Sequence, residues 1–319
     1  MLLNMTIENF KSVKSPQTIS FEAVKDSRLP ASKVVQVNEK LSVIKTSAII
    51  GPNGAGKSSF VRALEVLKRI VTSSEEEENV LTKSLAGTTF AYGIDKATPA
   101  TISIDVLLDK GEDGNPEKPS VIARYTIKAN REKIFEESLY HIIGGSRKLM
   151  FERIINDEGY SYRFGKLYRG EKKRQAAKLS ETRTFLQGSA LKGGATSSEL
   201  YYWFIDSLNI LPMGVSEKAE QFCVDMLKAH PGWAEQLLNY LWSVDITDIN
   251  RIEVKESPDG KEHLRFTHIY VNDKKAEGYS NLFSKESLSL RRLVSIGIAF
   301  FETFITEKTL VIDDFGQLL

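Results

Sequence analysis

The stretch of the chain best suited to chemistry is a glycine-rich loop near the amino-terminal end. It reads Gly51-Pro52-Asn53-Gly54-Ala55-Gly56-Lys57-Ser58-Ser59. Glycines at this spacing let successive backbone N–H groups point at a polyphosphate, while Lys57 reaches the β and γ oxygens and Ser58 offers its hydroxyl to Mg²⁺. The sequence therefore predicts a site for ATP and Mg²⁺, with further nucleotide-binding residues at Asn53, Gly54, Ala55, Gly56 and Ser59.

The residues on either side of the loop predict the elements that hold it. Ser47-Ala48-Ile49-Ile50 is a short apolar run typical of a buried strand. After the loop, one side of a predicted helix is marked by Val61, Leu64, Leu67, Lys68 and Val71. A strand, a phosphate-binding loop and a helix in this order are the context that such a loop requires.

A second pair of candidate catalytic residues lies near the carboxyl-terminal end. Thr309-Leu310-Val311-Ile312 predicts an apolar strand, and it ends in Asp313 and Asp314. A phosphate-loop ATPase needs a carboxylate in the Mg²⁺ shell, a role that falls to Asp313. Asp314 is placed to orient and deprotonate the attacking water. About 255 residues separate Lys57 from Asp313, so a large lobe must be inserted between the two parts of the site.

Composition predicts an ordinary soluble, cytoplasmic protein. Of 319 residues, 41% are hydrophobic and 27% are charged, and the net charge is +1, so no global field draws the chain to nucleic acid or to an anionic membrane. No apolar run approaches the roughly 20 residues that span a bilayer, and the amino terminus is unlike a signal peptide. The single Cys223 excludes an internal disulfide, and the four histidines show no metal-ligand spacing.

An antiparallel β lobe is predicted between the two parts of the site. Residues 1–13 alternate apolar and polar side chains, and a second short strand is expected at 18–21. Five further strands, several separated by Gly, Asn or Pro turns, indicate a meander. They lie at 100–108, 121–129, 133–143, 148–155 and 160–164.

A basic stretch follows the meander. Two aromatic residues, Tyr162 and Tyr168, interleave with its basic side chains, and Glu171 is its one acid. Such a patch can hold a phosphate backbone, so nucleic acid is a candidate partner, although a solvated loop gives the same pattern. The basic residues are Arg163, Lys166, Arg169, Lys172, Lys173, Arg174 and Lys178.

The remaining sequence predicts a helical insertion and a hairpin. Helical patterns occupy 200–208, 217–229 and 233–244, and strands at 251–255 and 263–271 are separated by a turn at 257–260. We expect three parts: an ATPase lobe with the phosphate loop and meander at 1–165, the basic loop and helical insert at 166–250, and a second ATPase lobe at 251–319.

Two short segments resemble motifs of ABC-type ATPases. Glu286-Ser287-Leu288-Ser289, followed by basic residues and Leu293, resembles the signature segment in its non-transporter form, and Glu8-Asn9-Phe10-Lys11-Ser12 resembles the opening motif of chromosome-maintenance (SMC-like) and recombination ATPases. With landmarks at Leu139-Tyr140, Phe185-Leu186 and Tyr202-Trp203-Phe204, nearly the whole chain resembles the ABC-like ATPases of bacterial abortive-infection, or phage-defence, modules.

The resemblance implies both a fold and an assembly. The fold is α/β, an ABC-type P-loop NTPase head with a mixed sheet, an antiparallel β lobe and a helical insertion. The assembly is a head-to-tail homodimer or higher homo-oligomer, with ATP held between the phosphate loop of one subunit and Ser287 of another. Ser287, at a helix amino terminus, would donate to the γ-phosphate, and Lys11 would reach the nucleotide from its own subunit. An effector protein such as a nuclease is the implied partner, and no membrane is involved.

Two residues depart from the family pattern. Ser289 stands where the family has Gly, and its side chain crowds a close backbone approach to phosphate. Asp314 stands where a Glu follows the Mg²⁺-binding Asp, and its side chain is one methylene shorter, so slow hydrolysis is expected. The chain also stops at Leu319, before the switch histidine of the family. We therefore expect a fragment of a longer protein, or a remainder that is a separate chain.

Three functions stay open on the sequence. The first is an ATP-hydrolysing switch that dimerises around ATP and controls an effector in anti-phage defence, with Lys57, Ser287 and Asp314 as catalytic residues. The second is a DNA-engaging, SMC-like repair or recombination ATPase, which the opening motif and the basic stretch favour. The third is a nucleotide-sensing scaffold with little turnover, favoured by Ser289 and Asp314.

Overall fold

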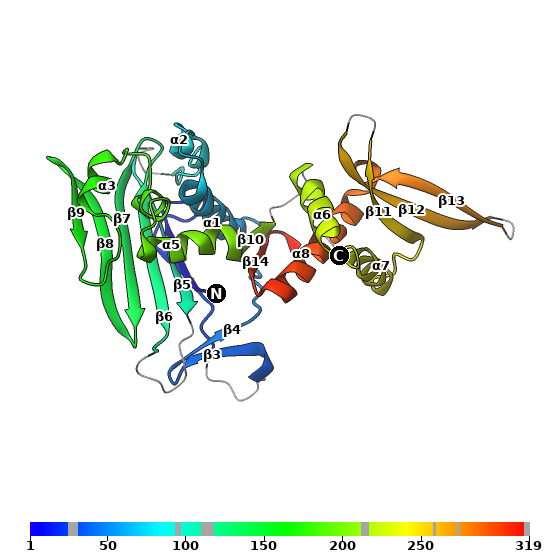
Figure 1. Ribbon diagram of the computed structural model, residues 1–319, viewed down its shortest axis with the longest axis horizontal. Helices are drawn as coiled ribbons and strands as arrows, with labels where there is room; N and C mark the ends of the chain where they lie inside the picture. Colours follow the sequence, from blue (N-terminus) through cyan, green and yellow to red (C-terminus); the bar gives the residue numbers. More distant parts are fainter. Residues whose placement is uncertain are drawn as a thin grey trace. The chain divides into compact units, whose positions relative to one another are not determined.

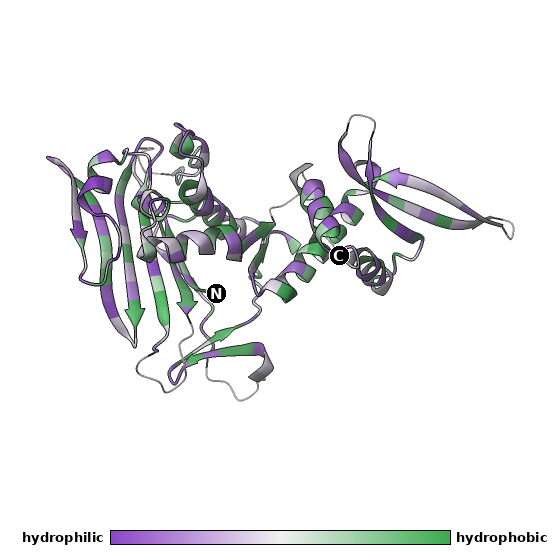
Figure 2. Cartoon of the chain, in the orientation of Figure 1, coloured by the Kyte–Doolittle hydropathy of each residue, from purple (hydrophilic) through white to green (hydrophobic). Residues whose placement is uncertain are grey.

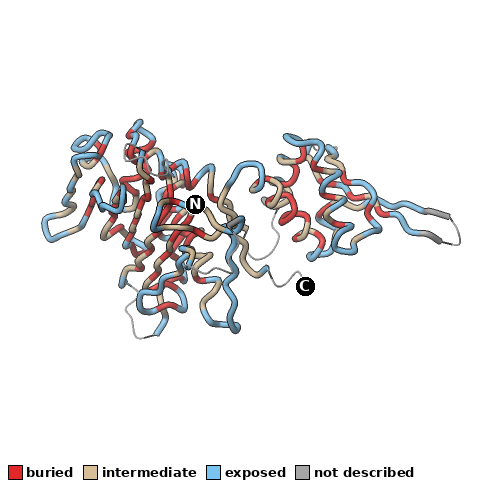
Figure 3. The backbone as a smooth tube through the Cα atoms, turned by 90° about the horizontal axis from the view of Figure 1, so that it is seen from below, coloured by how far each residue is buried: buried red, intermediate tan, exposed pale blue. Residues whose placement is uncertain are grey.

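The structure is a computed structural model that describes residues 1–24, 31–92, 97–109, 118–211, 217–257, 260–272 and 275–315 (Figure 1). The chain divides into two compact units, Met1–Ser207 and Leu208–Leu319. Each unit has its own buried core, which Figure 3 marks along the backbone. The three-part division expected from the sequence stays a prediction. Of the predicted hairpin turn, Pro258 and Asp259 lie outside the described residues.

A seven-stranded antiparallel sheet forms the body of the first unit. Its order is β2-β1-β5-β6-β7-β8-β9, so the five strands from β5 onward are the predicted meander. The bounds are β1 Leu2–Glu8, β2 Gln17–Ser20, β5 Ala100–Asp109, β6 Val121–Ala129, β7 Ile134–Ile143, β8 Ser146–Asn156 and β9 Gly159–Phe164. A separate hairpin, which the sequence analysis did not predict, pairs β3 Val34–Asn38 with β4 Leu41–Ile44 after the short 3₁₀ turn η1 Ala31–Lys33.

Alternation along the strands gives the sheet one apolar and one polar face (Figure 2). In β6, Ala123, Tyr125 and Ile127 are buried, while Arg124 between them donates to Asp105 of β5 across the polar face. A period of two places alternate side chains on opposite faces, so one face is free to pack against helices.

The helices of the first unit pack against this sheet. Helix α1 Lys57–Thr72 contacts β1, and α5 Ala195–Tyr202 contacts β5. The apolar side of α1 is buried through Leu64, Leu67 and Val71, as its spacing predicted. The other helical elements are α2 Val80–Ser84, α3 Lys173–Lys178, α4 Phe185–Ala190 and the π-helical turn η2 Trp203–Ser207.

Two sequence predictions in this unit are wrong. Residues 47–50 are exposed and form no strand, with Ile50 91% exposed. A strand needs a neighbouring edge for its backbone N–H and C=O groups, and no described strand of the first unit pairs with this segment. The helix expected at 200–208 ends at Tyr202, continues as the π turn η2, and gives way to a strand at Leu208.

The second unit combines two small sheets with three helices. Strand β10 Leu208–Leu211 pairs in parallel with β14 Thr309–Ile312. A three-stranded antiparallel sheet contains β11 Ile249–Glu256, β12 Glu262–Asn272 and β13 Lys275–Leu282. The helices are α6 Glu217–Ala229, α7 Trp233–Ser243 and α8 Leu288–Thr306, and the 3₁₀ turn η3 Phe283–Lys285 leads into α8.

The core of the second unit lies where α6, α7 and α8 meet β11 and β12. Cys223, Leu237, Phe266 and Val294 are completely buried there. Cys223 is therefore a packed apolar side chain, and burial raises the pKa of its thiol to about 12. The predicted hairpin is confirmed as β11 and β12, while the third strand, β13, was not predicted. No helix among the described residues has both the length and the apolar character needed to cross a membrane.

Candidate nucleotide site

The phosphate loop occupies the turn that leads directly into α1. Residues 51–55 are exposed, and α1 begins at Lys57. Gly54 and Gly56 have φ values of +81° and +92°, which an L side chain rarely adopts, so both positions need glycine. The loop carries exposed backbone at the start of a 16-residue helix, whose N–H groups and dipole favour an anion.

The side chain of Lys57 folds back over its own loop. Its Nζ atom donates to the carbonyl oxygens of Gly51 at 2.7 Å and of Pro52 at 2.9 Å. Both acceptors are neutral, so the positive charge of Lys57 is held at the loop without a carboxylate. An incoming phosphate oxygen would offer a charged acceptor, which makes the stronger hydrogen bond.

The opening motif lies beside the loop. Asn9 and Lys11 have φ values near +50°, and Phe10 and Val13 exchange backbone hydrogen bonds, so residues 9–14 form a tight turn. The buried Asn9 amide anchors this turn by donating to Thr98 O at 3.0 Å. The side chain of Lys11 is exposed, as a residue that reaches a nucleotide must be.

Ser12 joins the opening turn to the first turn of α1. Its hydroxyl lies 2.9 Å from the hydroxyl of Ser59, which is 5% exposed. A Cβ atom at Gly56 would lie 3.0 Å from Ser12 Oγ, so the glycine also permits this close approach. Ser58, the predicted Mg²⁺ ligand, is exposed next to this contact. The structure therefore brings together Lys11 and the loop residues Asn53, Gly54, Ala55, Gly56, Lys57, Ser58 and Ser59.

In the second unit, Ser287 caps helix α8. Its Oγ accepts from Leu290 N at 3.2 Å, which satisfies one of the free N–H groups at the helix start. Ser287, Leu288 and Ser289 are all exposed. The predicted position of Ser287 at a helix amino terminus is confirmed, and its hydroxyl hydrogen stays available for donation.

The two carboxylates follow β14 as predicted. Asp313 N donates to Leu211 O at 3.0 Å, which extends the parallel pairing by one residue. Asp314 has φ +53°, a left-handed conformation that turns the chain sharply after the strand. The buried guanidinium of Arg292, on α8, donates to the main-chain oxygens of Asp313 and, at 3.3 Å, of Asp314. Helix α8 and the turn that carries the two carboxylates are thus joined directly.

A second polar group supports the start of α8. His268 lies between two carboxylates: its Nδ1 is 2.7 Å from Asp248 Oδ2, and its Nε2 is 2.9 Å from Glu286 Oε1. Burial acts to lower the pKa of His268, but the hydrogen bonds to Asp248 and Glu286 outweigh it and raise the pKa. The ring also stacks on Tyr279. Because Glu286 precedes Ser287, this cluster fixes the approach of the chain to the cap.

The residues of the predicted site fall in both units. Lys11 and the loop lie in the first, and Ser287, Asp313 and Asp314 lie in the second. Their meeting around one ion stays a prediction. The structural roles of Ser12, His268 and Arg292 were not predicted from the sequence. Ser12 belongs to the quoted opening motif and Arg292 to the basic pair after the signature, whereas no sequence signal marked His268.

The donor set fits the predicted ligands. One exposed hydroxyl and one carboxylate, from Ser58 and Asp313, suit Mg²⁺, which keeps several of its waters and takes few protein ligands. Exposed loop backbone without Cβ atoms at Gly54 and Gly56 suits a polyphosphate.

Comparison with known families finds a match within the first unit. Residues 47–190 match the family described as "AAA domain, putative AbiEii toxin, Type IV TA system". The matched residues include the phosphate loop and the meander, and they end before Ser287, Asp313 and Asp314. A comparison with curated proteins found no match. Residues 47–190 are therefore similar to a P-loop ATPase domain family that is associated with abortive infection.

Proposed function

We propose that the protein is an ATP-binding and ATP-hydrolysing switch of the ABC type. Two copies would close head to tail around ATP and Mg²⁺, and this closure would control an effector protein, such as a nuclease, in antiviral defence in the cytoplasm. The observation that carries the proposal is the phosphate loop itself, with Lys57 held over two neutral carbonyls at the start of α1.

The residues of this chain supply four functions in the proposed reaction. Lys57 would exchange Gly51 O and Pro52 O for the β and γ oxygens, and Lys11 would approach from the neighbouring turn. Mg²⁺, held by Ser58 and Asp313, would neutralise the developing charge. Ser287 of a second copy would donate to the γ-phosphate at the positive end of α8. Asp314 would orient the attacking water and accept its proton.

The ATP site is tested with Lys57→Ala. We expect loss of ATP binding by isothermal titration calorimetry, while Lys40→Ala, at an exposed lysine in the β3–β4 turn, binds like the wild type. Equal ATP affinity in Lys57→Ala and in the wild type would refute the assignment.

The dimer is tested at Ser287. Asp is as good a helix cap as Ser, so Ser287→Asp keeps the fold of α8 but sets a negative charge against the γ-phosphate. We expect this variant to stay monomeric with ATP and Mg²⁺ in sedimentation experiments in which the wild type dimerises. Ser284→Asp, an exposed control on η3, adds the same charge away from the cap and should still dimerise.

Hydrolysis separates the switch from the nucleotide-sensing scaffold. The one-methylene deficit of Asp314 predicts that Asp314→Glu turns over ATP faster than the wild type and that Asp314→Ala is inactive. If neither the wild type nor either variant releases phosphate at steady state, the nucleotide-sensing scaffold is favoured.

A role in nucleic-acid binding gains little support from the contacts of the basic stretch. Arg163 pairs with Glu152, Arg174 lies 3.6 Å from Glu171, and Tyr168 is only 2% exposed. Tyr168 is therefore packed within the first unit, while the two arginines are exposed and form ion pairs with carboxylates of the same unit. A repair or recombination function stays a secondary prediction, tested by salt-dependent DNA binding.

A further inference from the structure

A polar cavity of about 210 Å³ lies in the first unit, apart from the phosphate loop. Its wall is built from α3, the segment that leads into α4, and the residue Lys192 that follows α4. Three cations line it, Lys178, Arg183 and Lys192, together with one carboxylate, that of Glu75. The carboxyl-terminal end of the basic stretch thus opens onto a concave surface rather than onto a flat solvated one.

The lining cations have only neutral partners. Arg183 donates to Ser73 Oγ at 2.9 Å and to the main-chain oxygens of Glu75 at 2.9 Å and Glu77 at 2.6 Å. Lys192 Nζ donates to the amide oxygen of Gln175 at 2.6 Å. Within the described part of the chain, Lys178 has no hydrogen bond or ion pair. No carboxylate in the described ranges pairs with any of the three, so their charge remains available to a ligand.

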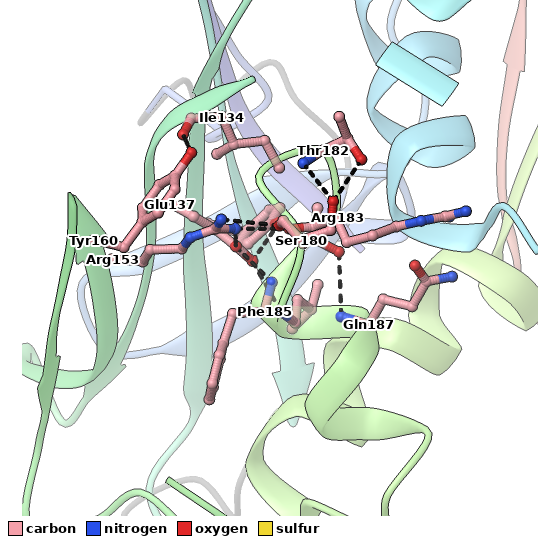
Figure 4. A network of polar contacts seen from close by, with 12 residues as sticks. Ile134, Glu137, Arg153, Tyr160, Ser180, Thr182, Arg183, Phe185 and Gln187 are labelled. Atoms are coloured by element: carbon pink, nitrogen blue, oxygen red, sulfur yellow. Dashed lines mark hydrogen bonds and ion pairs between the residues drawn. The ribbon is translucent and has the colours of Figure 1, made fainter. Parts of the chain in front are cut away.

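The wall of the cavity is held from behind by a buried ion pair (Figure 4). Arg153 is fully buried and donates to Arg183 O at 2.7 Å and to Ser180 O at 3.0 Å. Its partner Glu137 accepts from Phe185 N at 2.6 Å. Figure 4 shows the side chain of Arg183 pointing away from this pair. The lining segment is therefore fixed before any ligand arrives, which lowers the entropic cost of binding.

A buried amide completes the lining. Gln175 is only 3% exposed, and its Nε2 has no hydrogen-bond partner among the residues that the structure describes. A Cβ atom at position 188 would lie 2.0 Å from this Nε2, so Gly188 leaves the room that the amide occupies. This Nε2 is not among the fully buried unpaired polar atoms of the described residues, so solvent reaches it and it is open to a ligand oxygen in the cavity.

Charge and size select the ligand. Three cations against one carboxylate match a phosphomonoester, which carries roughly −1.5 to −2 charges at pH 7, better than a carboxylate or an internal phosphodiester with one charge. The volume lies below the roughly 300–1,000 Å³ of pockets that enclose drug-sized ligands, so the cavity suits a phosphoryl group rather than a whole nucleotide. We propose that this cavity binds the terminal phosphoryl group of a small phosphomonoester or of a phosphorylated strand end, contacted by Lys178, Lys192 and Gln175.

The proposal is tested by calorimetry on the full chain carrying Lys57→Ala, which removes the phosphate loop as a competing site. The probes are inorganic phosphate, AMP, adenosine, and a short oligothymidine with either a 5′-phosphate or a 5′-hydroxyl. In this background, Lys178→Gln with Lys192→Gln neutralises the cavity. The matched control is Lys166→Gln with Lys173→Gln, which removes two charges of the same basic stretch outside the lining. All four lysines are exposed, so both double variants should keep the parental melting temperature.

We expect AMP or the 5′-phosphorylated strand to bind, and the cavity double variant to lose at least about tenfold in affinity, while the control changes less than about twofold. Adenosine and the 5′-hydroxyl strand should not bind. Binding of AMP or phosphate alone identifies a free phosphomonoester as the source, and preferential binding of the phosphorylated strand identifies a strand end. Absence of binding to every phosphorylated probe overturns the proposal, as does an equal loss in the two double variants.

Discussion

The Ser12 hydroxyl lies 2.9 Å from the Ser59 hydroxyl, and this contact attaches the opening turn to the helix that begins at the phosphate loop. The two residues are 47 positions apart in the sequence. Through this contact, a motif at the start of the chain lies beside the phosphate loop. The nucleotide contact of Lys11, the residue before Ser12, stays a prediction.

The first prediction concerns this contact. Ser12→Ala removes one hydrogen bond, so the free energy of unfolding should fall by only about 0.5–1.5 kcal/mol, whereas ATP affinity should fall severalfold because the turn no longer holds Lys11 in place. Thr18→Ala is the matched control, since Thr18 and Thr6 form a hydroxyl pair of 2.8 Å away from the loop. Calorimetry and urea denaturation measure both quantities. A similar loss of ATP affinity in both variants would contradict the prediction.

The second prediction concerns the ion pair behind the cavity. Arg153 and Glu137 are both 0% exposed and lie 4.0 Å apart. Arg153→Met leaves the carboxylate and two carbonyl oxygens without their cation, so urea denaturation should show a loss of about 3–5 kcal/mol. Arg62→Met breaks an exposed pair with Glu65 on α1 and should cost about 0–1 kcal/mol. Comparable losses in the two variants would show that the buried pair adds nothing beyond an exposed one.

The third prediction is a pH dependence centred on His268. Its folded-state pKa is raised above the ordinary 6.5 because the hydrogen bonds to Asp248 and Glu286 outweigh burial. Its contribution to stability is therefore complete below pH 6.5 and is lost as pH rises through the folded-state pKa. The stability difference between the wild type and His268→Gln should shrink over that range in urea titrations. A stability difference that stays constant over that range would contradict the prediction.

The fourth prediction has the opposite sign. Burial lowers the pKa of His141 from 6.5 to about 4, and its Nε2 lacks a hydrogen-bond partner among the described residues. Between pH 6.5 and 4, His141 is protonated in the unfolded chain but neutral in the folded chain. The free energy of unfolding therefore falls as pH falls through this range. In His141→Phe this group is absent, so the free energy of unfolding should fall by up to about 3 kcal/mol less than in the wild type over the same pH range. Parallel acid-denaturation curves for the two proteins would refute it.

The sequence predicted those elements whose pattern is decided locally. The meander alternates apolar and polar residues in register with its strands, and α1 shows its apolar side at Leu64, Leu67 and Val71. The end of β14 at Ile312, just before Asp313, was also predicted, because two charged carboxylates follow the apolar run.

Other elements depend on contacts that a local pattern does not contain. Residues 47–50 have the composition of a strand but lack a paired edge in their own unit. Strand β13 Lys275–Leu282 is rich in polar residues and contains Gly278, so it forms because β12 offers it hydrogen bonds. The links made by Ser12, His268 and Arg292 join residues from 18 to 47 positions apart, and such pairings emerge only from the folded chain.

Arg292 gives the second unit a mechanical property. Its guanidinium donates to the main-chain oxygens of Asp313 and Asp314 in the turn after β14. Because of these hydrogen bonds, α8 has little freedom to tilt unless this turn moves with it. A displacement of the exposed start of α8 would therefore move the backbone of Asp313 and Asp314 with it.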